Sequence, residues 1–316
     1  MKFICLFIVS MFLFSCFNEA YYKRDDVISS GYTAFVKDQS FQSDKVYKYL
    51  PGRYFLEIED KGAVYNLEGL ENIEIDGSDI SIVGNNKSSL FYVKNCKNIT
   101  IKNFLKIEGF QSIVSFDSCS NVKVLNNAFV SRDSSLMSPA IDINISNKVE
   151  IINNNIFGFE EGVLSKRSQD ININANGFNE QNLCDIKIDR CKDVDIFNNL
   201  FDNLEGSSID ISKSTPVNIN YNIFSNSYYG VTYSGNDTES KVRLGYNTFR
   251  NIAKHGVQVD SLKDLTIIGS NFTDCGNGIV INYLTKLNLS NNSFDNCKGN
   301  FLSLDNFENA DIVDNS

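Results

Sequence analysis

Basic and acidic side chains recur at one fixed spacing in the middle of the chain. Lys187 and Asp210 are 23 residues apart, and so are Lys166 and Asp189. A polysaccharide lyase would use Lys187 or Lys166 as its base, and Arg190 would neutralise the substrate carboxylate. If Lys187 is the base, Lys166 would help to bind the substrate. A glycoside hydrolase would instead use two carboxylates, Asp189 and Asp210. Solvated ion pairs on an exposed sheet would give the same pattern, and such pairs contribute little to stability.

Further basic and aromatic residues extend this candidate site. Arg167, Arg190 and Lys213 share the 23-residue spacing and fall at the adjoining turn. Tyr233 and the single histidine, His255, are expected close to the charged residues, where they would contribute to binding. His255 precedes a turn glycine, which is more typical of a surface residue than of a catalyst.

These residues can meet only if the chain returns on itself about every 23 residues, and a repeated phrase indicates that it does. The phrase reads apolar-x-apolar-x-x-Asn-x-Phe. In the copy that contains residues 153–155, one extra residue precedes the phenylalanine, Phe157. Its phenylalanines lie at positions 129, 157, 178, 201, 224, 249, 272 and 294. Alternating short strands, with Gly or Asn at the corners and no helical periodicity, indicate one coil per repeat. A leucine-rich consensus is missing, and a propeller blade would need about 40 residues. The sequence predicts an all-β fold, a right-handed parallel β-helix of about ten coils with a short N-terminal cap.

Equal positions in successive coils should form ladders, because neighbouring strands lie about 4.8 Å apart. We expect the phenylalanines to stack inside the solenoid. The asparagines of the phrase should form a hydrogen-bonded amide ladder at one turn while adopting its left-handed backbone conformation. These asparagines are Asn127, Asn176, Asn199, Asn222, Asn247 and Asn292.

Composition narrows the function classes. With 42% hydrophobic and 22% charged residues over 316 positions, the chain is neither disordered nor a multi-span membrane protein. A net charge of -10 argues against nucleic acid as a partner. The same charge disfavours polyanionic substrates unless calcium bridges them; no other cofactor is evident from the sequence. There is no tryptophan to stack on sugars, although the 14 tyrosines can do so.

The N-terminus is predicted to be a targeting segment. Lys2 precedes an apolar run that ends at Phe14, too short to span a bilayer. Residues 13–16 resemble a bacterial lipobox, in which Cys16 would carry lipid and anchor the protein to the outer membrane or cell surface. Cleavage near Ala20 would instead give a secreted or periplasmic protein. We therefore divide the chain into a signal peptide (1–16), a tether with the start of the cap (17–44) and a β-helix (45–316).

Six cysteines follow the signal and lipidation positions. Cys96 and Cys119 occupy equal places in neighbouring repeats, as do Cys275 and Cys297. Each pair could form a disulfide or a metal site. A stack of small residues inside the solenoid is the simpler interpretation, because no zinc-type spacing accompanies the cysteines.

The opening of the repeat region resembles that of pectate-lyase-like β-helix proteins. Residues 47–54 contain Pro51, Gly52 and Tyr54, and this turn leads into a first coil at residues 70–77. The chain is identified by this resemblance as a member of the parallel β-helix superfamily, whose members commonly act on polysaccharides. The polygalacturonase and mannuronan-epimerase signatures are not found. The last phrase ends at Ser316 without a cap, which predicts a further domain or partner there.

Three functions are consistent with these features: a polysaccharide lyase or hydrolase, a surface-anchored carbohydrate-binding or adhesion protein, and a structural solenoid. The first two share a polysaccharide partner.

Overall fold

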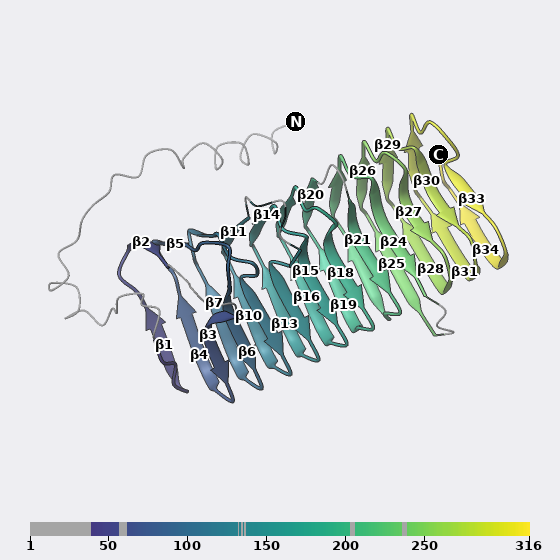
Figure 1. Ribbon diagram of the computed structural model, residues 1–316. Coiled ribbons are helices and arrows are strands. Elements are labelled where there is room, and N and C mark those ends of the chain that lie inside the picture. Colours follow the sequence, from purple (N-terminus) through teal and green to yellow (C-terminus); the bar gives the residue numbers. More distant parts are fainter. Residues whose placement is uncertain are drawn as a thin grey trace.

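The computed structural model describes residues 39–56, 62–131, 133, 135, 137–202, 206–235 and 239–316. These residues form three parallel β-sheets that wind into a solenoid and contain no helix (Figure 1). Eleven strands in each of two sheets correspond to about eleven coils, close to the expected ten. The predicted signal segment, Cys16 and most of the tether lie outside the described residues.

The first sheet has twelve strands in the described residues. They are β1 (Lys45–Lys48), β4 (Glu71–Asp76), β7 (Lys97–Lys102), β10 (Ser120–Leu125), β13 (Asn147–Ile152), β16 (Gln169–Asn174), β19 (Lys192–Phe197), β22 (Val217–Asn220), β25 (Lys241–Gly245), β28 (Leu262–Ile268), β31 (Leu284–Ser290) and β34 (Phe307–Val313).

The second sheet consists of shorter strands. They are β2 (Gly52–Phe55), β5 (Ile80–Val83), β8 (Lys106–Glu108), β11 (Ala128–Val130), β14 (Asn155–Phe157), β17 (Gly177–Asn179), β20 (Leu200–Asp202), β23 (Ile223–Ser225), β26 (Thr248–Arg250), β29 (Asn271–Thr273) and β32 (Ser293–Asp295).

The third sheet completes each coil. Its strands are β3 (Ala63–Glu68), β6 (Ser89–Lys94), β9 (Val114–Asp117), β12 (Ile141–Asn144), β15 (Glu161–Lys166), β18 (Cys184–Asp189), β21 (Ser207–Ser212), β24 (Tyr229–Ser234), β27 (His255–Val259), β30 (Asn277–Ile281) and β33 (Leu302–Leu304).

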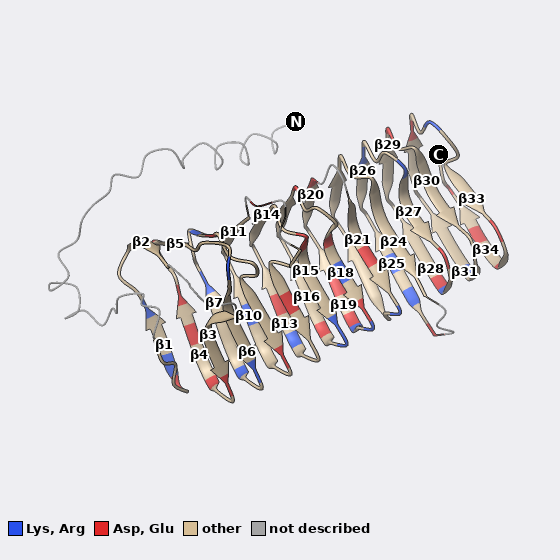
Figure 2. Cartoon of the chain, in the orientation of Figure 1, with Lys and Arg blue, Asp and Glu red and all other residues tan. Residues whose placement is uncertain are grey.

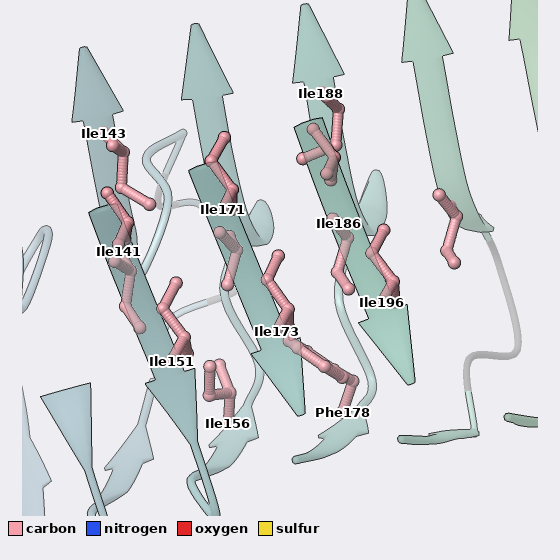
Figure 3. Close-up of a cluster of buried hydrophobic side chains, with 14 of the residues drawn as sticks. Ile141, Ile143, Ile151, Ile156, Ile171, Ile173, Phe178, Ile186, Ile188 and Ile196 are labelled. Carbon is pink, nitrogen blue, oxygen red and sulfur yellow. The ribbon is translucent and has the colours of Figure 1, made fainter. Parts of the chain in front are cut away.

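The core is a continuous column of apolar side chains between the three sheets (Figure 3). Strand alternation explains it, because residues such as Ile171 and Ile173 point inward while their neighbours face solvent. From Phe178 to Phe294 the phenylalanines stack as expected, with neighbouring ring centroids 4.6–5.2 Å apart. Phe41 packs on Tyr65 at the N-terminal end of this column.

One member of the phenylalanine series was assigned wrongly. Ile156, not Phe157, pairs with Phe129 and Phe178 and is fully buried. Phe157 is the next residue along β14 and is only half-buried. The phrase therefore has no extra residue in this coil: Asn154 occupies the ladder position, and isoleucine replaces phenylalanine in the core.

The amide ladder is present and is longer than expected. Asn222 Nδ2 donates to Asn247 Oδ1 at 3.2 Å, and Asn199 Nδ2 donates to Asn222 Oδ1 at 3.1 Å. Asn154 joins the ladder, and Asn315 accepts from Asn292 at 2.9 Å. The left-handed conformation belongs to the residue before each ladder asparagine, so that part of the expectation was wrong.

A second ladder of small residues lies at the turn from the third sheet to the first. The backbone N–H of Cys119 donates to Ser146 Oγ, and that of Cys191 donates to Ser214 Oγ. All six cysteines of the described region are free thiols, and all but Cys297 are buried. This arrangement favours the small-residue interpretation of the cysteines.

Candidate functional site

The outer face of the third sheet brings the predicted charged residues together. Lys187 of β18 lies beside Asp210 of β21, and Lys166 of β15 lies beside Asp189. Basic and acidic residues are interspersed over these strands (Figure 2). The register follows from the fold, because Ile186 and Ile188 must face the core and the residues alternating with them therefore face outward.

Glu161 is a member of this site that the repeat pattern did not reveal. Its carboxylate Oε1 lies 3.8 Å from Lys187 Nζ, and its side chain is almost completely buried. Burial and the neighbouring Glu160 raise the pKa of Glu161, and the charge of Lys187 opposes this only in part. Glu161 begins β15 and pairs with Cys184, which carries no charge. The alternation of basic and acidic residues in neighbouring coils, which pointed to Lys187 and Asp210, therefore did not point to Glu161.

Asp142 of β12 is a second carboxyl group of this kind. Burial raises the pKa of Asp142; Lys166 opposes the increase, and Asp117 reinforces it. Its partner in β15 is the buried Leu164. A raised pKa favours the protonated form of a carboxyl group, and in that form the group can donate its proton to a reacting oxygen.

Asp189 has the opposite character. Burial alone would raise its pKa, but hydrogen bonds outweigh that effect and hold the pKa below its ordinary value. Arg190 Nη2 and Nε donate to Asp189 Oδ2 at 2.7 and 2.9 Å, and Ser212 Oγ donates to Oδ1 at 2.7 Å. Asp210 accepts a hydrogen bond from Thr232 Oγ1 at 2.9 Å. Asp189 is thus held as a carboxylate and is unsuited to act as an acid.

Three cations follow one another at the turn beside these strands. Arg167, Arg190 and Lys213 occupy equal places in successive coils, with left-handed φ angles of 50°, 52° and 46°. Non-glycine residues rarely adopt this conformation, and like charges at this spacing repel. Arg167 Nη2 donates to Asn144 Oδ1 at 2.9 Å. The row forms a positively charged border along the outer face of the third sheet.

Tyr233 does not belong to the site, and that prediction was wrong. It is 1% exposed and pairs with Ile211 and Val259. Its place in the alternation of β24 sends the ring into the core, because the outward residue of that strand is Thr232.

His255 lies on the same sheet but is distant from Lys187. It begins β27, three strands beyond β18, a separation of about 14 Å at the usual strand spacing. Its Nδ1 lies 3.0 Å from Asn277 Nδ2, and its ring is 5.6 Å from that of Tyr229. Burial and the charge of Lys254 lower the pKa of His255.

Comparison with known families supports the architecture. The family model for the right handed beta helix region matches residues 89–245 and 239–316. The chain belongs to this family. No curated protein sequence matches this β-helix protein significantly.

Solved structures show the same fold at low sequence identity. The β-helix protein is similar to tailspike protein 3 of bacteriophage CBA120, with 13% identity and a TM-score of 0.54 over 91% of this chain. The chain spans 57% of that tailspike. It also matches the A-module of the mannuronan C-5 epimerase AlgE6 from Azotobacter vinelandii, with 10% identity, 86% of this chain, 80% of the module and a TM-score of 0.43. The catalytic domain of a GH87 α-1,3-glucanase in complex with nigerose has 10% identity, 84% and 63% coverage and a TM-score of 0.36. At these identities the likeness concerns the fold alone.

The described residues of the β-helix protein contain neither a cluster of metal-binding side chains nor a membrane-spanning helix. Within the described ranges, no group of three or more His, Cys, Asp and Glu side chains is arranged to hold a metal ion. The part of the chain that the structure describes also has no helix with the length and apolar character of a membrane span.

Proposed function

We propose that the protein binds an acidic polysaccharide along the outer face of the third sheet and cleaves it by elimination. The observation that carries this proposal is the buried Glu161 carboxyl group, whose pKa is raised and which lies 3.8 Å from Lys187 Nζ. A proton donor and a basic side chain are thereby held together on a face bordered by cations.

Each residue has a defined role in the proposed reaction. Lys187 removes the proton from the carbon that bears the sugar carboxylate. The electron pair of that C–H bond forms a carbon–carbon double bond, and the adjacent glycosidic C–O bond breaks. Glu161 gives its proton to the leaving oxygen, while Arg190 and the other cations of the turn stabilise the negative charge on the substrate carboxylate.

Hydrolysis by Asp189 and Asp210 has weaker support. A hydrolase needs one of its two carboxyl groups to be protonated. The hydrogen bonds from Arg190 and Ser212 hold Asp189 in its ionised form. Elimination instead makes use of Glu161, whose raised pKa favours the protonated form that a proton donor needs.

An activity screen tests the proposal. The purified protein is incubated with polygalacturonate, alginate and hyaluronan, with and without calcium, and new unsaturated and reducing ends are measured. We expect unsaturated ends, and a loss of about 100-fold or more in rate with Glu161→Gln or Lys187→Met. Glu68→Gln and Lys94→Met are matched controls, because this pair lies on the same sheet with its charged atoms 3.6 Å apart.

Each other result has a distinct meaning. Reducing ends without unsaturation would replace elimination by hydrolysis. Binding without products would leave a carbohydrate-binding or adhesion protein. Neither binding nor products would reject the proposal in favour of a structural solenoid.

We also propose that the protein is exported and held at a membrane surface by lipid on Cys16. The support is the apolar run up to Phe14 followed by Ser15 and Cys16. Metabolic labelling with a fatty acid should mark the protein and should fail with Cys16→Ala. Label retained by the variant would exclude this anchor and favour a secreted or periplasmic protein.

A further inference from the structure

A groove of about 330 Å³ lies on the outer face of the first sheet, away from Glu161 and Lys187. It is formed by β19, β22 and β25 and by the turns that follow the latter two. The residues that line it are Asp195, Asn218, Asn220, Tyr221, Arg243 and Tyr246. Its volume is at the lower end of the range for small-ligand sites.

Two tyrosines form one wall of the groove. The rings of Tyr221 and Tyr246 are stacked, with centroids 5.2 Å apart and planes inclined by 9°. The two residues are 58% and 52% exposed, so this aromatic surface faces solvent. Exposed aromatic rings beside polar groups are suited to the apolar C–H faces and hydroxyl groups of sugars.

The backbone at these tyrosines is unusual for their residue type. Tyr221 and Tyr246 have φ angles of 58° and 56°, in the left-handed region that disfavours bulky side chains. At the same place in most other described coils the chain has Asn or Gly, such as Asn198, Gly269 and Asn291, which suit this conformation, and Ala175 occupies it once. Strain of this kind collects where a side chain is needed for function.

Polar groups line the rest of the groove. Asn218 Nδ2 donates to Asp195 Oδ1 at 2.8 Å, which satisfies part of that carboxylate. Arg243 is exposed and has no hydrogen bond or ion pair to any other described residue. Asn220 lies over Gly245, where a Cβ atom would come within 2.5 Å of its Oδ1. Glycine at this position allows the Asn220 amide to reach its place in the groove.

We propose that this groove binds a sugar ring that carries an acidic substituent, a carboxylate or a sulfate. Tyr221 and Tyr246 contact the ring, Asn220 bonds its hydroxyl groups, and Arg243 pairs with the acid in a two-pronged contact. The proposal shares the acidic sugar class with the proposed function, but it concerns a different sheet and requires no catalysis.

Binding is tested by NMR on protein carrying ¹³C-labelled tyrosine, with Tyr221 and Tyr246 assigned by substitution. The probes are hexasaccharides of polygalacturonate, alginate and chondroitin sulfate, with cellohexaose as the neutral control. We expect at least one acidic probe to shift both tyrosine signals. Glu161→Gln protein should respond in the same way, so a failure of the catalytic proposal would not affect this result.

Two variants make the test decisive. Arg243→Met and Tyr246→Asn should each weaken binding of that acidic probe at least tenfold. Tyr246→Asn should melt at the same temperature as the parent protein or slightly above it, because asparagine suits the left-handed turn. A loss of binding by this variant therefore cannot be attributed to a loss of folding. The proposal is overturned if no acidic probe shifts these signals, if cellohexaose binds as tightly, or if both variants bind unchanged.

Discussion

Residues at equal positions in successive coils form rows along the axis of this solenoid. The rows inside it and the charged rows on its outer face differ in residue type, although the same coil spacing generates both. Inside, Asn199, Asn222 and Asn247 repeat one residue type, and each amide bonds the next. Outside, Lys187 lies beside Asp210, and neither residue is repeated in the adjacent coils.

The chemistry of stacking explains this difference. An amide carries both a donor and an acceptor, and an aromatic ring stacks on its own kind, so identical residues stabilise each other along the axis. Identical charges repel, so outer rows of charged residues tend to mix residue types, whereas amides in outer rows, such as Asn98 and Asn121, can repeat and bond each other. The repeated cations Arg167 and Arg190 run against this tendency, and the stacked rings of Tyr221 and Tyr246 leave aromatic surface exposed to solvent, so both rows are suited to contact ligands.

The largest predicted effect concerns the amide ladder. Asn222→Leu removes bonds to Asn247, to the Ile196 and Asn220 carbonyl groups and from Asn199. Because buried partners are left unsatisfied, we expect a loss of about 5 kcal/mol or more in the free energy of unfolding.

The measurement is equilibrium unfolding in denaturant. The matched control is Asn288→Leu, at a half-exposed position on β31, which should change stability by about 0.5 kcal/mol or less. Equal effects of the two substitutions would contradict the distinction between interior and outer rows.

The next effect tests which residue of β14 belongs to the core. Phe224→Ala should cost about 3–5 kcal/mol, because that ring is stacked between Phe201 and Phe249. Ile156→Ala should cost about 2–5 kcal/mol and Phe157→Ala about 1 kcal/mol or less. Thermal and chemical melts of the three variants check this order, and a larger loss for Phe157→Ala would reverse the assignment.

The smallest effect depends on pH and concerns Asp185, an acidic residue at an interior position. Asp185 is fully buried, and within the described ranges no hydrogen bond of good geometry satisfies its carboxylate oxygens, so that Ser208 contributes at most a weak one. Burial raises the pKa of Asp185 well above its usual value, and Ser208 opposes this only in part. A carboxyl group whose pKa is raised by folding stabilises the fold below its unfolded-state pKa. That contribution is lost as the pH rises toward the folded value, by at most about 1.4 kcal/mol per pH unit.

Asp185→Asn removes this titration without changing the shape of the side chain. We expect the stability difference, variant minus parent, to grow from pH 4 to pH 8 in denaturant titrations. Parallel pH profiles for the two proteins would show that Asp185 does not titrate in this way.

The residues of the candidate site were only partly predictable. The pairing of Lys187 with Asp210 followed from spacing, since strand register is determined by which residues must be buried. Glu161 was missed because its neighbours in the row, Cys184 and Ser207, carry no charge. Tyr233 was misplaced because a tyrosine suits both an outer face and a core, and alternation counted from Thr232 decides between them.

The amino-acid sequence by itself determined the coil length, the Asn and Phe ladders and the inward face of most strands. These features are encoded by short local patterns, and the same pattern recurs in successive coils. The tertiary structure alone decided that Ile156 replaces Phe157 in the core, that Glu161 meets Lys187, and that Tyr221 and Tyr246 border a groove with Arg243. Such features depend on contacts between side chains of neighbouring coils, and these contacts exist only once the coils are stacked.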